Sequence, residues 1–203
     1  MTPAPMYVAL EGAEGCGKST QAELLATTLG AVLTRETGGT DVGRRLRSIL
    51  HDTTVTDLDD RAEALIAAAD RAQHVARVVR PALERGQPVV SDRSVFSTLA
   101  YQGHGRGLDL DELRRINDWA IGGLWPSHVI LLDAPTAVMA QRLDDRELDR
   151  FERAGDAFHD RVLSGFHQMA AADPGRWAVV DASGDIAVVA ARVLEALGRR
   201  VAP

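Results

Sequence analysis

The chain has 203 residues and is poor in cysteine and in long apolar runs, and each shortage excludes a structural class. Cys16 is the single cysteine, so no disulfide can form within the chain, which fits a reducing cytoplasm. No apolar run approaches the roughly 18 residues that a membrane-spanning helix needs, so we expect no membrane segment. Residues 1–5 lack the charged and apolar parts of a signal peptide, and we expect a loose tail there.

Positive charge is also scarce, since 23 Lys and Arg residues stand against 29 Asp and Glu residues, for a formal net charge of −6. Proteins that bind the backbone of nucleic-acid polymers usually carry a basic surplus, so we expect no such partner. Apolar residues still make up 45% of the chain, enough for a buried core in one domain of this length. The composition therefore predicts a soluble, cytoplasmic protein with a single domain over residues 1–203.

Five short apolar segments alternate with helical patterns along the chain. They are residues 7–10, 31–34, 88–91, 129–132 and 177–180, and each is apolar on both faces. Strands of this kind, separated by helices, are typical of a parallel sheet that is covered on both sides. We therefore predict an α/β fold with a five-stranded parallel sheet, helices on both faces, and ligands along the edge where the strands end.

The longest helical pattern runs over residues 58–85. Its apolar positions, which include Leu58, Leu65 and Leu83, recur at steps of three and four and predict one stripe that faces the core. The opposite face must look at solvent, a partner or a ligand, and it carries Glu63, Ala67, Asp70, Arg71 and His74. Pro81 lies within this run, so we expect a break or kink there.

Residues 12–19 match the pattern G-x-x-x-x-G-K-[ST], between a predicted strand and a predicted helix over residues 18–29. The glycines let the backbone curl so that its N–H groups point at the phosphates of ATP, and the helix start adds positive potential. Lys18 is predicted to reach the β- and γ-phosphates, and Ser19 to bind Mg²⁺ through its hydroxyl. The predicted ATP-binding residues of this P-loop are Gly12, Ala13, Glu14, Gly15, Cys16, Gly17, Lys18, Ser19 and Thr20.

Six segments in one order resemble bacterial thymidylate kinase, from about Tyr7 to Ser183. They are LEGAEGCGKST at 10–20, TRETGGT at 34–40, DRAQH at 70–74, SDR at 91–93, AYQG at 100–103 and ELDR at 147–150. The resemblance implies a P-loop NTPase fold of the nucleoside monophosphate kinase type that moves the γ-phosphoryl group of ATP to dTMP. It also implies a homodimer with its contact on the helix at 58–85. Another nucleoside or nucleotide kinase of this fold, or a non-transferring NTP-binding switch, stays open as an alternative.

The resemblance implies roles for residues around the sugar and base of dTMP. Glu14 would accept a hydrogen bond from the 3′-OH of the deoxyribose, and Tyr101 would pack against C2′ and so select deoxyribose over ribose. Arg71 would read a carbonyl of thymine. The other residues implied to line the substrate site are Glu36, Ala67, Ser97, Thr98 and Gln102.

Three arginines are implied to clamp the phosphate of dTMP: Arg35, Arg47 and Arg93. The planar guanidinium suits this work because it gives paired N–H bonds to phosphate oxygens. Arg93 directly follows a predicted strand, whereas Arg47 equally fits a surface charge on its helix. Asp92 is implied to hold Mg²⁺ through water, although Asp at this position also fits a helix N-cap.

Residues 142–154 resemble the flexible lid of this family, whereas their composition alone fits an exposed helix with i,i+4 charge pairs. One branch of the family carries a catalytic arginine in the P-loop and the other carries it in the lid. Gly15 occupies the loop position here, so the resemblance implies a lid arginine, with Arg146 as first choice and Arg150 as second. Arg142 is implied to pack on adenine. The catalytic residues so predicted are Lys18, Asp92, Arg93, Arg146 and Arg150.

Two positions depart from the family pattern. Ala67 stands where the family usually has an aromatic residue, mostly Phe, that stacks on thymine, so the base preference stays open. Our hypothesis is that Phe96 fills part of the missing volume. Thr37 stands where the family normally has Pro, and without its ring we expect a freer chain before Gly38.

Overall fold

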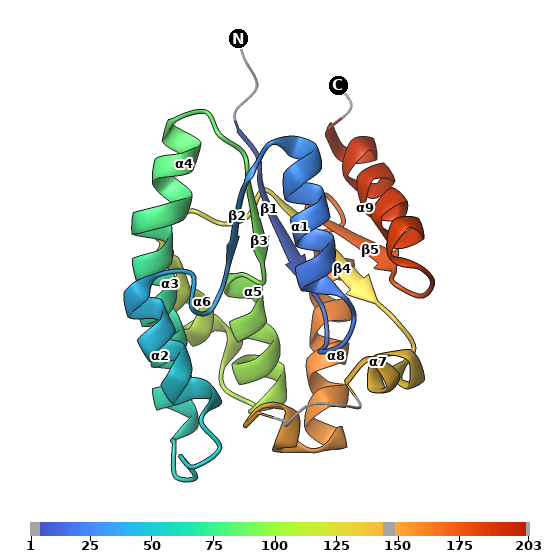
Figure 1. The fold of residues 1–203 in the computed structure, drawn as a ribbon. Coiled ribbons are helices and arrows are strands. Elements are labelled where there is room, and N and C mark those ends of the chain that lie inside the picture. Colours follow the sequence, from blue (N-terminus) through green and yellow to red (C-terminus); the bar gives the residue numbers. More distant parts are fainter. Residues whose placement is uncertain (1–4, 144–148, 202–203) are drawn as a thin grey trace.

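The computed structural model describes residues 5–143 and 149–201, and the sheet at its centre has five parallel strands (Figure 1). The strands are β1 (Tyr7–Glu11), β2 (Val32–Arg35), β3 (Val89–Asp92), β4 (His128–Asp133) and β5 (Trp177–Asp181), in the order β2-β3-β1-β4-β5. The predicted fold class and all five predicted strands are confirmed. Residues 1–4 of the predicted tail lie outside the described residues.

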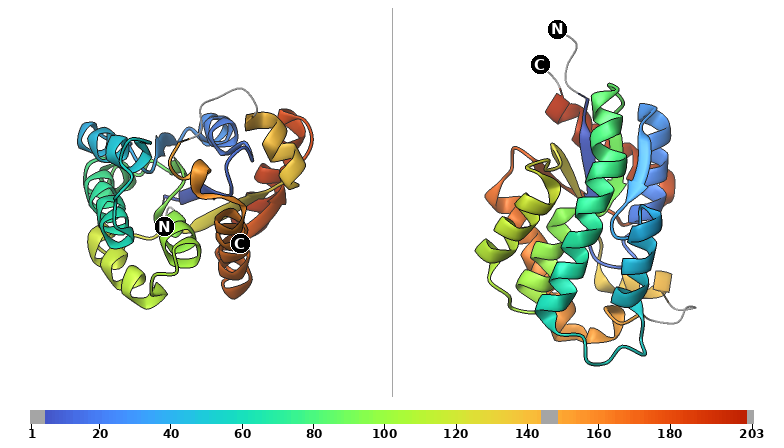
Figure 2. Two further views of the ribbon diagram at one scale, coloured as in Figure 1. Left: turned by 90° about the horizontal axis from the view of Figure 1, so that it is seen from below. Right: turned by 90° about the vertical axis from the view of Figure 1, so that its left-hand side faces the viewer.

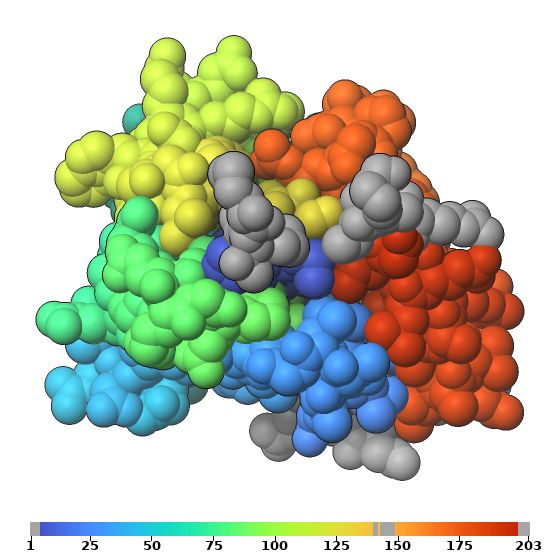
Figure 3. Space-filling view, turned by 90° about the horizontal axis from the view of Figure 1, so that it is seen from above, coloured from blue at the N-terminus to red at the C-terminus, as the bar shows by residue number. Residues whose placement is uncertain are grey.

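The register of the sheet brings the ends of three strands to one level. Leu10 of β1 pairs with Asp92 of β3, and Arg35 of β2 pairs with the same residue from the other side. The segments that follow these strands therefore start side by side at the carboxyl edge of the sheet. At the opposite edge, Figure 3 shows the ends of α4 (green), α1 (blue) and α9 (red) around the start of β1.

The helical elements lie between the strands and after the last of them (Figures 1 and 2). The α-helices are α1 (Lys18–Leu29), α2 (Asp41–His51), α3 (Asp60–His74), α4 (Arg80–Glu84), α5 (Val95–Thr98), α6 (Leu110–Ile121), α7 (Thr136–Leu143), α8 (Asp156–Ala172) and α9 (Ile186–Val201). Two π-helical segments, η1 (Val75–Val79) and η2 (Leu99–Gly105), and the 3₁₀ turn η3 (Glu152–Ala154) complete them. Among the described residues, no helix combines the length and the apolar character needed to span a bilayer.

Two hydrophobic clusters cover the two faces of the sheet. Alternate residues of each strand point to opposite faces, so Val8 and Leu10 pack toward α1 and α9, whereas Tyr7 packs toward the other side. On that other side, α3, η2, α6 and α8 contribute the buried apolar side chains, among them Phe166 with no exposed area. The sheet thus has helices on both faces, as the alternation of strands and helices predicted.

The helix predicted over residues 58–85 exists, but it starts at Asp60 and passes through η1 into α4. Asp59 caps its start, since its side chain accepts hydrogen bonds from the backbone N–H groups of Arg61 and Ala62. Pro81 lies in the first turn of α4, directly after the π-helical turn η1. The expected irregularity is therefore a widened turn, which gives room to the carbonyl that a proline ring would otherwise contact.

The face of this helix that we expected to pack in the core was predicted wrongly for α3, although its continuation at Val79 and Leu83 packs in the core. Leu65 has 55% of its surface exposed, and Ala69 and Ala76 are exposed as well, whereas Glu63 and His74 on the polar face are fully buried. Periodicity shows that two faces differ, but it does not say which one packs inward. The polar face is buried here because each of its charged groups has a partner on a neighbouring segment.

Candidate nucleotide-binding site

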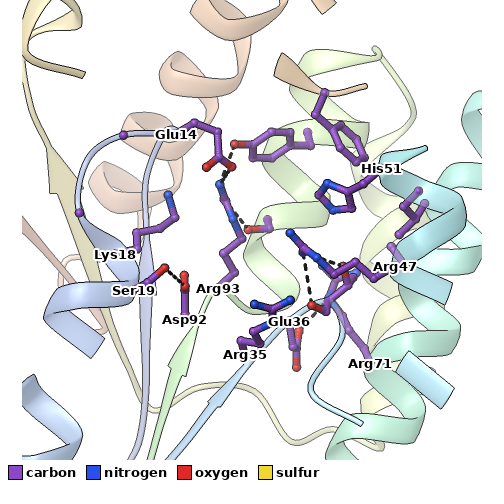
Figure 4. Close-up of a pocket in the computed structure, with 18 of the residues that line it drawn as sticks. Glu14, Lys18, Ser19, Arg35, Glu36, Arg47, His51, Arg71, Asp92 and Arg93 are labelled. Carbon is purple, nitrogen blue, oxygen red and sulfur yellow. Dashed lines mark hydrogen bonds and ion pairs between the residues drawn. The ribbon is translucent and has the colours of Figure 1, made fainter. Parts of the chain in front are cut away.

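A cavity of about 530 Å³ lies at the carboxyl edge of the sheet, where the sequence places the ligands. Figure 4 shows Lys18 and Ser19 on one side of it, Arg47 and Arg71 on the other, and Arg93 between them. The lining residues are Glu14, Gly15, Gly17, Lys18, Ser19, Thr20, Arg35, Glu36, Thr37, Arg47, Leu50, His51, Ala67, Arg71, Asp92, Arg93, Ser97, Tyr101, Gln102, Arg142 and Phe151. We call the side formed by residues 12–20 the P-loop end, and the side with Arg35, Arg47, Arg71 and Arg93 the arginine end.

The P-loop connects β1 to α1 with the curl that its glycines permit. Gly12 has a φ of 141°, and a Cβ atom there would lie 2.5 Å from the carbonyl oxygen of Leu132, so a side chain does not fit. Lys18 is buried inside the curl, where its Nζ donates to the carbonyl of Ala13 at 2.6 Å. Cys16 is buried behind the loop, so its backbone, rather than its thiol, is the part that faces a ligand.

Ser19 and Asp92, predicted from separate motifs to hold Mg²⁺, meet at the P-loop end. The Ser19 hydroxyl donates to Oδ2 of Asp92 at 2.5 Å, and Oδ1 of Asp92 is buried without a hydrogen-bond partner among the described residues. Ser94, not Asp92, caps α5, because the Ser94 hydroxyl accepts from the backbone N–H of Phe96. A hydroxyl beside a carboxylate with an unused oxygen is a donor set that fits Mg²⁺.

Arg93 joins the two ends of the cavity through four hydrogen bonds. Its Nη1 donates to the carbonyl of Gly12 and to Ser97 Oγ, both at 3.3 Å. Its Nη2 donates to Glu14 and, at 3.1 Å, to the hydroxyl of Tyr101. Burial acts to lower the pKa of Arg93, but the charge of Glu14, together with Tyr101, Glu11 and Asp92, outweighs burial and holds that pKa well above its usual value. Arg93 is therefore a permanent cation beside the P-loop.

The buried carboxylate of Glu11, at the end of β1, supports the segment that carries Arg93. It accepts hydrogen bonds from the backbone N–H and hydroxyl of Ser94, at 2.8 and 2.7 Å, and from the hydroxyl of Ser97 at 2.7 Å. Burial raises the pKa of Glu11, and these hydrogen bonds and the charge of Arg93 counter part of that rise. Glu11 belongs to the resemblance segment 10–20, but no role was predicted for it, because it lies just before the P-loop pattern.

Arg35 and Arg47 flank the turn that follows β2. A Cβ atom on Gly38 would lie 2.8 Å from Arg47 Cδ and 3.6 Å from Arg35 Nη2, so both side chains lie close to this glycine. Burial, followed by repulsion from Arg35 and Arg93, lowers the pKa of Arg47. Arg47 therefore faces the cavity rather than the outer surface, and three like charges converge where an anion would be stabilised.

Thr37, which stands where the family has Pro, lies in a turn that side chains hold in place. The Glu36–Thr37 peptide bond is cis. Arg47 Nη1 donates to both the carbonyl and the hydroxyl of Thr37 at 3.3 Å, and the N–H of Gly38 donates to Asp70 at 3.0 Å. These contacts supply anchors for the turn in place of the proline ring.

Arg71 is buried at the arginine end and is held on both edges of its guanidinium. Its Nε lies 3.0 Å from Oε2 of Glu36, Nη1 donates to Thr98 Oγ1 at 2.5 Å, and Nη2 donates to the carbonyl of Ser94 at 3.2 Å. Thr98 thus contacts Arg71 from behind, while Ala67, Ser97 and Gln102 line the cavity. The hypothesis that Phe96 fills the space beside Ala67 is wrong, since its ring packs against Trp125 and Trp177 in the core.

Three lining residues that no sequence signal indicated are Leu50, His51 and Phe151. The rings of His51 and Phe151 lie 5.3 Å apart, and Tyr101 follows at 5.8 Å from Phe151. His51 Nδ1 is 2.6 Å from Asp149, which ties the end of α2 to the segment after residue 148. Their contact depends on two segments that are distant in the chain, so no local pattern could reveal it.

Two of the described lid arginines are placed differently, since Arg142 lines the cavity and Arg150 does not. Arg142 lies over the P-loop, where Nη1 donates to the carbonyl of Gly15 at 3.3 Å. Arg150 pairs instead with the buried Glu63, whose Oε2 is 2.5 Å from its Nη2, and its Nε donates to the carbonyl of Leu50 at 2.9 Å. Arg146 lies outside the described residues.

These features together define the class of protein. A P-loop at the end of the central strand faces a cluster of arginines across one cavity, on a parallel sheet in the order β2-β3-β1-β4-β5. This is a P-loop NTPase fold of the nucleoside monophosphate kinase type.

Comparison with known proteins identifies the family. The sequence pattern of the thymidylate kinase family matches residues 10–193. Thymidylate kinase of Desulfovibrio desulfuricans is 44% identical over 96% of this chain and 97% of its own length. That of Bifidobacterium longum is 46% identical over 93% and 95%, respectively. The crystal structure of thymidylate kinase from Ehrlichia chaffeensis superposes with a TM-score of 0.79 at 31% identity, over 96% of this chain and 100% of that chain. This chain belongs to the thymidylate kinase family.

Proposed function

We propose that this chain transfers the γ-phosphoryl group of ATP to dTMP, giving dTDP and ADP, within one domain over residues 1–203. The observation that carries the proposal is one cavity with the P-loop at one end and Arg35, Arg47 and Arg93 at the other. A donor phosphate chain held by the P-loop and a monophosphate held by the arginines would then meet near Arg93. Family membership names the acceptor, and the arginines across the cavity from the P-loop support a site for its phosphate.

The donor is held by the P-loop, whose backbone N–H groups and Lys18 face the phosphates of ATP. Arg142 lies over the loop at the carbonyl of Gly15, in position to pack on adenine. Ser19 and Asp92 would hold Mg²⁺, which supplies neutralisation of the β- and γ-phosphate oxygens when bound. We infer this metal site from the hydroxyl–carboxylate contact and from the unused oxygen of Asp92.

The acceptor is held by charge at its phosphate and by shape at its sugar. Arg93, Arg47 and Arg35 stabilise the phosphate, which is already an anion at neutral pH and needs no base. Glu14, placed by its pairing with Arg93, accepts a hydrogen bond from the 3′-OH of the deoxyribose. Tyr101, whose hydroxyl contacts Arg93, packs against C2′ of the same sugar. Catalysis then rests on positioning and on stabilising the charge that spreads over the transferred phosphoryl group.

We place the catalytic arginine in the lid, because Gly15 leaves the P-loop without one. Arg146 remains the first choice and Arg150 the second. Arg150 pairs with Glu63, so it would have to leave this carboxylate before it could reach the transferred group. Substituting each arginine by Ala separately tests the order, since the catalytic one should lower kcat by about 10³-fold with little change in either KM.

We infer a homodimer whose contact is an exposed apolar face on α2, α3 and α6. These three helices pack side by side (Figure 2, right). Their exposed apolar side chains, which we call the α2–α3–α6 face, are Val42, Ile49, Leu65, Ile116 and Trp119. Trp119 has 84% of its surface exposed, and burying such a face is a strong reason for association.

A cytoplasmic location suits the single reduced thiol and the supply of ATP.

A coupled assay with ATP, Mg²⁺ and a panel of acceptors tests the function. We expect the highest kcat/KM for dTMP among dTMP, dUMP, dCMP, dGMP and thymidine. Preference for another acceptor would assign a different kinase activity on the same fold. Hydrolysis of ATP without transfer to any of the five would instead support an NTP-binding switch.

A further inference from the structure

Behind the arginine end lies a chain of three buried side chains, and no part of the proposed reaction uses its innermost member, His74. His74, in the last turn of α3, is fully buried, and both of its ring nitrogens have a polar neighbour. Nδ1 is 2.7 Å from Oε1 of Glu36, and Nε2 is 2.7 Å from Oγ1 of Thr34. The other oxygen of Glu36 is 3.0 Å from Nε of Arg71, which lines the cavity.

Glu36 is the link in this chain, and it is an anion held in the interior. Burial alone would raise its pKa, but the hydrogen bond and charge of His74 and the charge of Arg71 outweigh burial and lower it. A buried carboxylate that loses one of its partners is strongly destabilised, so it would turn or draw in water. The orientation of Glu36 toward Arg71 therefore depends on the imidazole on its other side.

Glu36 supports the guanidinium of Arg71 on one edge, the edge that carries Nε. Thr98 and the carbonyl of Ser94 accept hydrogen bonds from its two Nη atoms, whereas Nε meets Glu36 in an ion pair at 3.0 Å that lacks hydrogen-bond geometry. Two contacts on one edge still permit the plane of the group to tilt, and a bidentate contact to a ligand needs a fixed plane. A displacement of the Glu36 carboxylate would therefore tilt the guanidinium of Arg71 and alter its contact with the ligand.

We propose that His74 is a positioning residue, which fixes Glu36 and through it the plane of Arg71 toward the acceptor nucleotide. The proposal rests on the proposed function, because it takes Arg71 as a contact of the acceptor. His74 acts through its Nδ1–H, which donates to Glu36, while its Nε2 is held by the hydroxyl of Thr34 on the other side of the ring. Glu36 then serves mainly Arg71, rather than the acceptor directly.

Two amide substitutions separate the two ring nitrogens. In His74→Asn the side-chain NH₂ group lies near the place of Nδ1 and can donate to Glu36, whereas in His74→Gln it lies near Nε2 and reaches Thr34. Both variants lose an aromatic ring from the same buried site, so they are matched in their structural cost. We expect the KM for dTMP to stay within about twofold in His74→Asn and to rise about tenfold in His74→Gln.

The KM for ATP and the melting temperature, measured on the same samples, report any general structural damage. We expect each of these two quantities to be the same in His74→Asn and in His74→Gln. Equal changes of the KM for dTMP in His74→Asn and His74→Gln would overturn the positioning role. If His74→Gln does not fold, Glu36→Gln replaces it, and an unchanged KM for dTMP in that variant would overturn the role as well.

Arg71→Ala distinguishes a failure of this inference from a failure of the proposed function. A raised KM for dTMP in Arg71→Ala supports the premise that Arg71 contacts the acceptor. If this variant binds dTMP normally, the acceptor site itself is misplaced, and the inference about His74 is lost with it. If Arg71→Ala raises the KM and His74→Gln does not, only the positioning role is overturned.

Discussion

The two ends of the cavity are built in opposite ways. The P-loop end is a contiguous run, residues 12–20, whose shape follows from its glycines and from the start of α1. The arginine end collects side chains from segments far apart, so that Arg93 meets Glu14 across 79 positions of sequence and Arg71 meets Thr98 across 27. A contiguous loop binds with its backbone, whereas a collected site binds with side chains that need partners of their own.

This difference predicts which substitutions stay local. At the P-loop end the ligand is held by backbone N–H groups, which remain when a side chain is substituted. A single substitution there therefore acts mainly by removing the charge of a side chain. At the arginine end each guanidinium has a carboxylate, hydroxyl or carbonyl behind it, so a change can act through a neighbour. The expected outcomes below test this contrast from the largest effect to the smallest.

Removing the cation of the P-loop should break that end alone. We expect Lys18→Ala to lower kcat by about 10³-fold or more, because the charge that stabilises the transferred phosphoryl group is lost. Binding of dTMP, measured by calorimetry without ATP, should stay unchanged. Full activity in this variant would contradict the assignment of the P-loop as the donor site.

Removing one arginine should break the other end alone. We expect Arg47→Met to raise the KM for dTMP about 10- to 100-fold, because a charged hydrogen bond to phosphate is lost, with the KM for ATP unchanged. Arg44→Met is the matched control, since Arg44 lies on the same helix with 64% of its side chain exposed. An equal effect of the two substitutions would mean that only the net charge matters.

Changing the metal corner should alter the requirement for Mg²⁺. We expect Asp92→Asn to raise the concentration of Mg²⁺ that gives half of the maximal rate by about tenfold, because an amide replaces the charged oxygen. The titration should be repeated at saturating dTMP and ATP, so that binding of neither substrate limits the rate. A curve that superposes on that of the unchanged enzyme would place the metal elsewhere.

Leu65 of the α2–α3–α6 face lies on α3, which carries Arg71 on its buried side. Disrupting this face should therefore affect the arginine end before the P-loop end. We expect Leu65→Glu to give a monomer by size-exclusion chromatography with light scattering, and to raise the KM for dTMP a few-fold more than that for ATP. Leu24→Glu, at a site on α1 that is 39% exposed, is the control. A dimer that survives Leu65→Glu would argue against this interface.

Acid should weaken the buried chain at the arginine end. The pKa of Glu36 lies below its ordinary value of 4.5, so its stabilising effect is complete above pH 4.5 and is lost as the pH falls through the folded-state value. We therefore expect Glu36→Gln to show a smaller loss of unfolding free energy below pH 4.5 than the unchanged chain. Denaturant unfolding at a series of pH values measures it, and parallel curves would contradict the assignment.

Much of the fold could be predicted from the sequence, because its signals are local. The apolar periodicity that distinguishes a strand from a helix lies within each segment itself. The helix α1, for example, begins and ends at the predicted Lys18 and Leu29. The P-loop is equally local, since the spacing of its residues is the binding geometry. The lining of the cavity by Lys18 followed from the P-loop pattern, whereas that by Arg47 and Arg71 followed from the family resemblance.

What the tertiary structure alone decided concerns how these segments meet. The register of β1, β2 and β3 brings Arg35, Asp92 and the P-loop to one level, and no single segment encodes that register. The same packing turned the polar face of α3 inward, put Phe96 in the core and made Phe151 and His51 a wall of the cavity. A sequence period states that two faces differ, but only the partners supplied by distant segments determine which face is buried.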